Sequence, residues 1–293
     1  MALNLTATTS VVCHDAGAAN VILAWIRAQR DCNWRITMQG PAAKIWLAQD
    51  IPIAESYQTI EQALEGADVL LSGTSWASAL EHEARRQAKA RGLKTIAVID
   101  HWVNYKERFI RKGEIILPDE IYVTDEYALL EAKRCFPDLR IQIKHNLYQE
   151  ELVRKISPLS SLDDEVLYVL EPILGAEWCK EPAGEFQALD YFIANISRLG
   201  IRRNAKIRIR PHPSDASGKY DEWLASHREL NVVLDDSPTL ALAIGKAKWV
   251  VGCETYAMVV ALFAGRKVVS TLPPWAHRCR LPYSAITSLR DLE

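Results

Sequence analysis

A histidine held between two prolines is the clearest chemical signal in this 293-residue sequence. His212 follows Lys206–Arg210, where apolar and basic residues alternate, and this alternation predicts a strand. Proline fixes its own φ and biases the residue before it toward extended backbone, so the histidine is held at the carboxyl end of the strand. Open α/β sheets bind ligands at that edge. His212, Arg210 and Lys219 are therefore candidate phosphate ligands, the alternative being a solvated histidine at an ordinary strand exit.

A strand–helix–strand unit in the same half supplies a second candidate phosphate contact. Trp249–Gly252 and Lys267–Ser270 have the pattern of short strands, and Thr255–Phe263 has that of the helix between them. The first N–H groups of a helix have no partner within it and lie at the positive end of its dipole, where phosphate binds. Thr255 is the better phosphate contact. Glu254 either accepts hydrogen bonds from a ribose or sugar hydroxyl or only caps the helix.

Polar residues also follow the first predicted strand, Ser10–Cys13. His14 and Asp15 come next, and a turn of small residues that includes Gly17 leads into a helix. A strand, a turn of small residues and a helix start together form a place for a ligand. Asp15 is a candidate catalytic base or an N-cap of the helix, His14 is a further candidate base, and Gly17 is a candidate ligand contact.

A third polar segment follows the predicted strand Thr95–Ile99. Asp100 and His101 stand at its end, and aromatic and charged residues come after them. Such residues suit sugar recognition, because polar groups bind hydroxyls and aromatic rings pack on C–H faces. Asp100 is therefore a second candidate base and His101 a candidate substrate contact, and the alternative is a charged surface loop.

Alternating strands and helices must position these residues. Strands are predicted at Ser10–Cys13, Arg35–Met38, Val69–Ser72, Thr95–Ile99, Glu120–Val123, Ile141–Lys144, Glu165–Leu170, Lys206–Arg210, Val232–Leu234, Trp249–Gly252 and Lys267–Ser270. Helices are predicted at Ala18–Gln29, Ala42–Gln49, Thr59–Leu64, Ser78–Arg91, Asp125–Cys135, Glu185–Leu199, Tyr220–His227, Thr239–Ala247 and Thr255–Phe263. This alternation predicts an α/β fold with mostly parallel sheets covered by helices on both faces.

The segment Tyr148–Asp164 interrupts this alternation and predicts a linker, since it is rich in acidic residues and serine. It divides the chain into residues 1–150 and 151–293, each of a size that suits one domain. We expect two Rossmann-like domains that face each other across a cleft lined by the carboxyl ends of their strands.

The two motifs of the second half resemble a known family. The proline-bracketed histidine and the unit Gly252–Val268 (Gly-x-Glu-Thr, helix, Gly-Arg-x-Val) resemble the C-terminal domain of GT-B glycosyltransferases. The nearest likeness is to bacterial sialyltransferases, capsule Kdo transferases and CDP-glycerol-type polymerases, over roughly residues 165–275. The resemblance implies that His212 contacts the donor phosphate and that Thr255 binds the phosphate or a sugar carboxylate. It also implies a donor-binding domain at 151–293 and an acceptor-side domain at 1–150.

The function implied by this resemblance is transfer of an acidic sugar from a nucleotide donor, CMP-linked by preference, to a glycan or polysaccharide acceptor. No cofactor or metal is expected, because a single phosphate can be held by a histidine and a helix dipole. The base is Asp15 or Asp100, with His14 as a third option. Two alternatives remain: a GT-B-shaped nucleotide-sugar epimerase or hydrolase, and a non-catalytic nucleotide-sugar-binding protein in polysaccharide assembly.

Composition excludes several other classes. A net charge of −2 and a pI near 6.4 give no basic field for nucleic acid, and Arg85 and Arg86 are expected on a solvated helix face. Six cysteines without a Cys-x-x-Cys pair indicate reduced thiols, and no signal peptide or long apolar run is evident. We therefore expect a cytoplasmic protein. Peripheral membrane association stays possible at this point, and the sequence does not define the oligomeric state.

Overall fold

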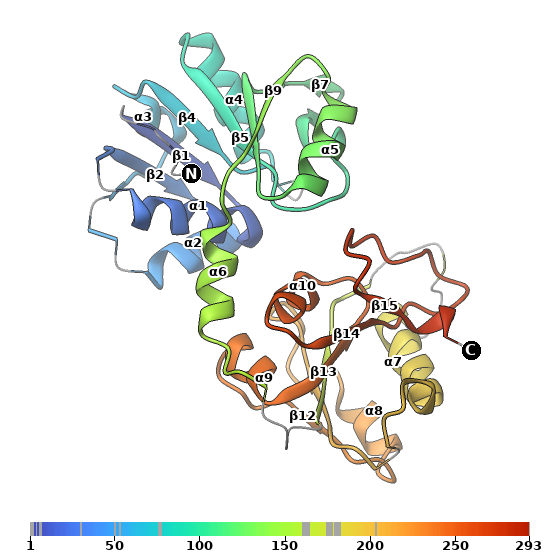
Figure 1. Ribbon diagram of the computed structural model, residues 1–293. Coiled ribbons are helices and arrows are strands. Elements are labelled where there is room, and N and C mark those ends of the chain that lie inside the picture. Colours follow the sequence, from blue (N-terminus) through green and yellow to red (C-terminus); the bar gives the residue numbers. More distant parts are fainter. Residues whose placement is uncertain are drawn as a thin grey trace. The chain divides into compact units, whose positions relative to one another are not determined.

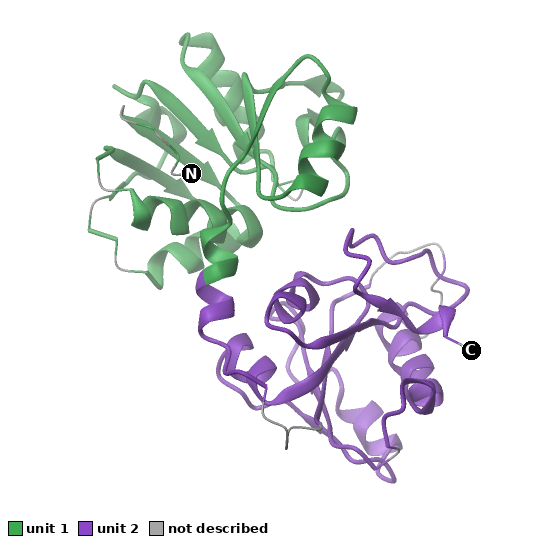
Figure 2. Ribbon diagram, in the orientation of Figure 1, with its two compact units in different colours: residues 1–150 green, residues 151–293 purple. Residues whose placement is uncertain are grey.

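The chain divides into two compact units, residues 1–150 (unit 1) and 151–293 (unit 2), each built on one parallel sheet (Figures 1 and 2). The structure is a computed structural model. It describes residues 3, 5, 8–29, 31–49, 51–52, 54–75, 78–159, 165–173, 178, 183–202 and 204–292.

Unit 1 holds a seven-stranded sheet in the order β3-β2-β1-β4-β5-β8-β9, with every neighbouring pair parallel. Its strands are β1 (Thr9–Cys13), β2 (Trp34–Met38), β3 (Ala54–Ser56), β4 (Val69–Ser72), β5 (Lys94–Val98), β8 (Glu120–Val123) and β9 (Arg140–Ile143). The helices are α1 (Ala16–Ala28), α2 (Gly40–Leu47), α3 (Ile60–Leu64), α4 (Leu80–Ala90), α5 (Glu126–Cys135) and α6 (Leu147–Arg154). A 3-10 turn (Glu107–Phe109) and the hairpin of β6 (Ile110–Arg111) and β7 (Glu114–Ile115) follow β5.

Both faces of this sheet are covered, as the sequence predicted. Side chains of a strand alternate between its faces, and β1 sends Val11 and Cys13 to a core cluster that includes α1. Val12 points the other way, into a cluster with α3 and α4. The strand order reverses at β1, since β2 lies on one side and β4 on the other. Ligands of open α/β sheets bind outside the carboxyl ends of strands at such a reversal.

Unit 2 repeats this plan with six parallel strands in the order β12-β11-β10-β13-β14-β15. The strands are β10 (Glu165–Val169), β11 (Ile207–Arg210), β12 (Val232–Leu234), β13 (Ala247–Gly252), β14 (Lys267–Ser270) and β15 (Thr287–Ser288). The helices are α7 (Gly184–Asn195), α8 (Asp221–Ser226), α9 (Leu240–Gly245) and α10 (Tyr256–Phe263), with 3-10 turns at Ile196–Leu199 and Leu289–Asp291. Here the order reverses at β10, between β11 and β13.

The boundary between the units falls within the segment Tyr148–Asp164 that was predicted as a linker, and the first part of this segment belongs to the helix α6. The Asn146 side chain accepts a hydrogen bond of 3.0 Å from the N–H of Gln149, which caps the first turn. Leu147 packs against the core of unit 1. Acidic residues in the first turn favour a helix start, so the same residues that indicated a linker also suit α6. Residues 160–164 lie outside the described part of the chain.

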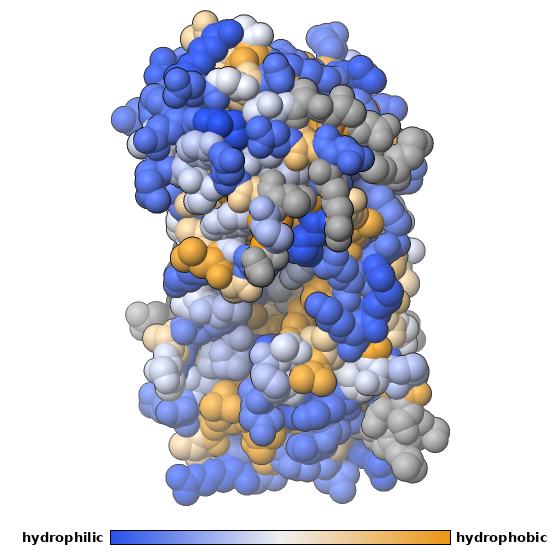
Figure 3. All heavy atoms as spheres, turned by 90° about the vertical axis from the view of Figure 1, so that its left-hand side faces the viewer, coloured by the Kyte–Doolittle hydropathy of each residue, from blue (hydrophilic) through white to orange (hydrophobic). Residues whose placement is uncertain are grey.

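Among the described residues, no helix combines the length and the apolar composition that crossing a membrane requires. The face of the molecule in Figure 3 is mainly hydrophilic, with hydrophobic residues scattered across it. The described cysteines are all free thiols: Cys13, Cys32, Cys135, Cys253 and Cys279.

Candidate functional site

Two aspartates that follow different strands meet at the carboxyl edge of the unit 1 sheet. Asp15 follows β1 and caps α1, since its Oδ1 accepts a hydrogen bond of 2.9 Å from the N–H of Ala18. Asp100 follows β5, two strands away. The capping role of Asp15, one of the two alternatives in the sequence, is thus present. The capping hydrogen bond uses Oδ1 of Asp15, and the groups around Asp15 determine how readily its carboxyl group takes up or releases a proton.

Gly17 brings these two aspartates together. A Cβ atom placed on Gly17 would lie 1.8 Å from Oδ2 of Asp100, a distance that no side chain tolerates. Asp100 therefore packs directly against the backbone of the first turn of α1. The requirement for glycine here comes from this close approach, and it explains the glycine in the predicted ligand turn without a ligand contact.

Burial and like charge dominate the electrostatics of this pair. Burial, followed by the charge of Asp100 and then that of Glu81, raises the pKa of Asp15 to about 7. The nearest counter-charge is the guanidinium of Arg108, whose Nη1 lies 3.6 Å from Oδ1 of Asp100. Two acids in one site cannot both ionise easily, so near neutral pH the pair carries a proton that it can exchange.

The two candidate histidines of unit 1 lie at the same sheet edge. The backbone N–H of His14 donates a hydrogen bond of 2.8 Å to Oε1 of Glu81. Its ring packs on Gly40, where a Cβ would lie 2.4 Å from Nε2 and where φ is +55°. His101 packs at a tilt against Trp102, with ring centroids 5.3 Å apart. His14 is thus next to Asp15 in the chain, while its backbone contacts Glu81 and its ring contacts Gly40.

Glu81 is the residue of this site that the sequence did not reveal. It lies in the first turn of α4 with no exposed surface, although an acidic residue there is typical of a solvated helix start. The available signal was the spacing of Leu80, Ala84 and Ala88, which marks a buried helix face next to position 81.

In unit 2, His212 stands at the carboxyl end of β11 with its ring orientation fixed. Its backbone N–H donates a hydrogen bond of 2.9 Å to Asp215, and its Nδ1 lies 2.7 Å from Oγ and 3.2 Å from the backbone nitrogen of Ser214. Burial lowers the pKa of His212, and the charge of Lys219 adds to this effect. The neutral ring with Nδ1 as acceptor carries its proton on Nε2, which makes His212 a hydrogen-bond donor to a ligand rather than a cation.

The two predicted cations of this site already have acidic partners. Arg210 donates to Asp235 and to the carbonyl of Ser237. Lys219 pairs with Asp215 at 2.7 Å and with Glu185 at 2.6 Å. Both positive charges are thus balanced within unit 2, and Lys219 supports His212 through the Asp215 carboxylate that both contact.

Thr255 and Glu254 begin α10, at the same edge of the unit 2 sheet. Thr255 is the N-cap residue, and its side chain makes no capping hydrogen bond. Glu254 contacts two basic groups, His277 at 3.3 Å and Arg280 through a two-pronged contact. His212 and Thr255 follow β11 and β13, the two neighbours of β10.

A carboxylate lies at the start of α10, where the sequence predicted free amides. Glu171, which follows β10, accepts a hydrogen bond of 2.5 Å from the backbone N–H of Glu254. Burial, partly opposed by this hydrogen bond, raises the pKa of Glu171 to about 7, and the charge of Glu254 adds to the rise. The amide of Glu254 therefore has a partner, and a titratable carboxyl group lies at this helix start.

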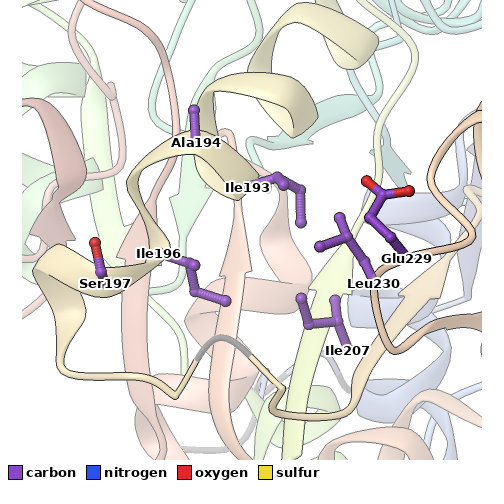
Figure 4. Close-up of a pocket in the computed structure, with 7 residues that line it drawn as sticks. All are labelled: Ile193, Ala194, Ile196, Ser197, Ile207, Glu229 and Leu230. Carbon is purple, nitrogen blue, oxygen red and sulfur yellow. The ribbon is translucent and has the colours of Figure 1, made fainter.

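A cavity of about 310 Å³ lies at the opposite end of the unit 2 sheet (Figure 4). Ile207, the first residue of β11, lines it together with Ile193, Ile196 and Leu230. None of the predicted site residues lines it. Parallel sheets bind substrates at the carboxyl ends of their strands, so the chemistry of the two sheet edges, rather than this cavity, marks the candidate site.

Comparisons with solved structures identify the fold. A structure from Listeria monocytogenes, described as a candidate UDP-N-acetylglucosamine 2-epimerase, matches with a TM-score of 0.59 and 11% identity over 90% of this chain and 79% of that chain. UDP-GlcNAc 2-epimerase from Neisseria meningitidis, bound to UDP-GlcNAc, matches with a TM-score of 0.55 and 9% identity over 86% and 79%. The glycotransferase of kitacinnamycin matches with a TM-score of 0.49 and 12% identity over 90% and 80%. No protein-family model and no curated protein matches the sequence.

These likenesses confirm the predicted fold class. At such low identity the first two matches show the fold alone, an α/β chain with two Rossmann-like parallel sheets of the GT-B type. The finer likeness to sialyltransferases and capsule Kdo transferases stays a prediction.

Proposed function

We propose that the protein is an enzyme that acts on a nucleotide-linked sugar, with the carboxylates of unit 1 carrying out proton transfer. The observation that supports this proposal most is that Asp100 packs against Gly17 next to Asp15, at the strand β1 where the strand order of the sheet reverses. With the pKa of Asp15 raised to about 7 by burial and by Asp100, the pair holds both an ionised and a protonated form near neutral pH. A general acid–base catalyst works best with a pKa near the working pH.

In this proposal, unit 2 binds the nucleotide. The Nε2–H of His212 and the amides and hydroxyl at the start of α10, near Thr255, bind the phosphate as uncharged donors at the positive end of a helix dipole. Arg210 and Lys219 make no direct contact with the phosphate in this proposal, because acidic side chains of unit 2 already bind them.

In the transfer reaction, Asp15 or Asp100 takes the proton of an acceptor hydroxyl, with His14 as the third option. The acceptor oxygen forms a bond to the anomeric carbon, and the bond from that carbon to the phosphate oxygen breaks. The electron pair leaves with the nucleotide phosphate, which His212 and the α10 start stabilise. The resemblance of the C-terminal half favours a CMP-linked acidic sugar as donor and a glycan or polysaccharide as acceptor. His101 and Glu254 are then candidate contacts for sugar hydroxyls.

A nucleotide-sugar epimerase is the second candidate. Inverting a C–H centre needs a group that removes the proton and a group that returns it, and the neighbouring carboxyl groups of Asp15 and Asp100 are the candidates for these roles. The two similar structures with the higher TM-scores are described as UDP-N-acetylglucosamine 2-epimerases, one of them as a candidate. On this proposal the donor is UDP-linked and no acceptor is used. A hydrolase would release the sugar to water, and a non-catalytic binding protein would have no use for the carboxylate pair.

One experiment separates these possibilities. The protein is incubated in D₂O with UDP-GlcNAc or with a CMP-linked acidic sugar, each with and without a glycan acceptor, and the products are followed by NMR. A transferase releases nucleotide only with acceptor. An epimerase gives an inverted, deuterated sugar without acceptor, and a hydrolase gives free sugar. Binding without any product indicates the non-catalytic role, and neither binding nor turnover with any nucleotide sugar would contradict the proposal.

A further inference from the structure

Glu81 is a buried acid that helix formation alone does not explain. Its side chain has no exposed surface, whereas Glu83, two residues further along α4, is partly exposed and pairs with Arg86. A buried carboxylate loses its hydration, and only hydrogen bonds or opposite charges within the fold can compensate for that loss.

The contacts of Glu81 lead to the turn that carries His14 and Asp15. Its Oε1 accepts the backbone N–H of His14 at 2.8 Å. Its Oε2 is buried and has no hydrogen-bond partner among the residues that the structure describes. A Cβ on Gly73 would lie 3.2 Å from Oε1, so the carboxylate also packs closely on the backbone that follows β4.

No direct ion pair among the described contacts neutralises Glu81. Arg85 lies one turn further along α4, but its guanidinium donates to the hydroxyl of Ser72 at 3.1 Å and to the carbonyls of Gly73 at 3.1 Å and Ile116 at 3.3 Å. Arg85 is itself buried, which corrects the solvated position expected from the sequence. Its charge acts on Glu81 from a distance.

The other charged and titratable groups around Glu81 come from the loops at the ends of β1 and β5. Asp15, His14 and the buried thiol of Cys13 interact electrostatically with Glu81. The charges of Asp15 and Asp100 also act on the Cys13 thiol. Arg108 is the cation on the far side of this group, next to Asp100. Acidic groups therefore outnumber the cations that face them.

We infer that Glu81 is a positioning residue of the carboxylate pair, which holds the His14–Asp15 turn through the backbone N–H of His14 and places a third acidic group beside Asp15 and Asp100. Its hydrogen bond to the backbone of His14 ties the turn that carries Asp15 to α4. Its charge disfavours ionisation of Asp15, so a proton stays on the pair at higher pH than two aspartates alone would allow. The part that Glu81 plays in turnover rests on the proposed function, but its effect on Asp15 does not.

The test follows the carboxyl groups directly, without substrate. The full-length protein is prepared with aspartate labelled by ¹³C at the side-chain carboxyl, and Asp15 and Asp100 are assigned from their Asn variants. We expect Glu81→Gln, which keeps an oxygen to accept the His14 N–H, to lower the titration midpoint of Asp15. Glu83→Gln is the matched control on the same helix and should leave this midpoint unchanged. Glu81→Asp, which keeps the charge on a shorter side chain, should fall between wild type and Glu81→Gln.

Two results would overturn the inference. The first is an Asp15 titration that is the same in folded Glu81→Gln as in wild type and Glu83→Gln. If Glu81→Gln does not fold, wild-type protein labelled at the glutamate carboxyls replaces it. Glu81 should then titrate above the ordinary range, because burial raises its pKa, and its midpoint should fall in Asp15→Asn. The second contradicting result is a titration midpoint of Glu81 that lies in the ordinary range and does not change in Asp15→Asn. Neither readout depends on finding the reaction.

Discussion

In unit 1 the carboxyl edge of the sheet gathers Asp15, Asp100 and Glu81 with Arg108 as the nearest cation, whereas in unit 2 the same edge gathers His212, Thr255 and Glu171 around a helix start. The first arrangement is rich in groups that take and release protons. The second offers hydrogen-bond donors to an anion, with one titratable acid among them. The two sheets thus carry different residue types at topologically equivalent places.

This difference arises on two sheets that share the strand order around their first strand. In each unit the strand order reverses at the first strand, β1 or β10, with the second strand on one side and the fourth along the chain on the other. The fold therefore determines where ligands bind, and the residues just after each strand determine which chemistry is available there.

The largest effect is expected from the aspartates of unit 1. An asparagine at the true base still caps or packs but cannot take a proton, so turnover should fall ~10²–10⁴-fold while nucleotide affinity is unchanged. Asp15→Asn and Asp100→Asn are compared by turnover and by calorimetry with CMP and UDP. If Asp15 is the base, wild-type kcat should also rise with pH through about 7, since only the ionised form accepts a proton.

Asp125 provides the matched control for these variants. It follows β8 and caps α5 through a hydrogen bond of 2.8 Å from the N–H of Ala128, as Asp15 caps α1. Asparagine is also a good N-cap, so Asp125→Asn should keep full turnover. If Asp15→Asn and Asp100→Asn both match Asp125→Asn in turnover, proton transfer by this pair is excluded.

Gly17→Ala should disturb the same pair without removing either carboxylate. The new Cβ would lie 1.8 Å from Oδ2 of Asp100 and must push it away. Misplacement of a catalytic group by about 1 Å can cost ~10²-fold in rate, so we expect a loss of that order in kcat. Ala16→Ser, an exposed change in the same turn, is the control. Equal turnover of Gly17→Ala and wild type would show that the contact with Asp100 does not matter for catalysis.

Much of this fold follows from local sequence pattern. The predicted strands Ser10–Cys13 and Lys206–Arg210 agree with β1 and β11 to within one residue, because alternation and strand-end residues act locally. The short strand β3 was missed, since it pairs only with β2 and its residues are mostly exposed. The helix α6 was missed because its acidic residues are equally typical of linkers.

The candidate site was only half accessible from sequence. Asp15 and Asp100 were found because each follows a strand, but their meeting depends on the strand order and on the missing side chain of Gly17. Glu81 and Arg85 were not found, since a charged residue in a helix is normally solvated, and the spacing of Leu80, Ala84 and Ala88 marks a buried helix face without showing that position 81 belongs to it. Local sequence pattern therefore did not predict the contacts between residues far apart in the chain.

In unit 2, removing the His212 imidazole should weaken nucleotide binding. A hydrogen bond to a charged group contributes about 1.5–3 kcal/mol, which corresponds to roughly 10- to 100-fold in affinity. His212→Ala is tested by calorimetry with CMP and UDP. His227→Ala is the control in the same unit, because that ring stacks on Trp223 at 4.1 Å and belongs to no proposed contact. Unchanged affinity in His212→Ala would remove His212 from the phosphate site.

The smallest effect is expected at Glu171 and concerns stability. Burial raises its pKa in the folded protein to about 7 from the ordinary 4.5. The folded state therefore keeps a proton that the unfolded chain has released, and this contribution to the free energy of unfolding is complete below about pH 4.5 and lost as the pH rises through 7. Glu171→Gln cannot ionise, and its oxygen still accepts the N–H of Glu254. Its stability relative to wild type should thus increase between pH 5 and pH 8, by about 1–3 kcal/mol.

Urea unfolding at both pH values measures this difference, with the exposed Glu222→Gln as control. A relative stability of Glu171→Gln that is the same at both pH values would mean that the carboxyl at the α10 start is already ionised at pH 5, and that a fixed negative charge lies where we propose that a phosphate binds.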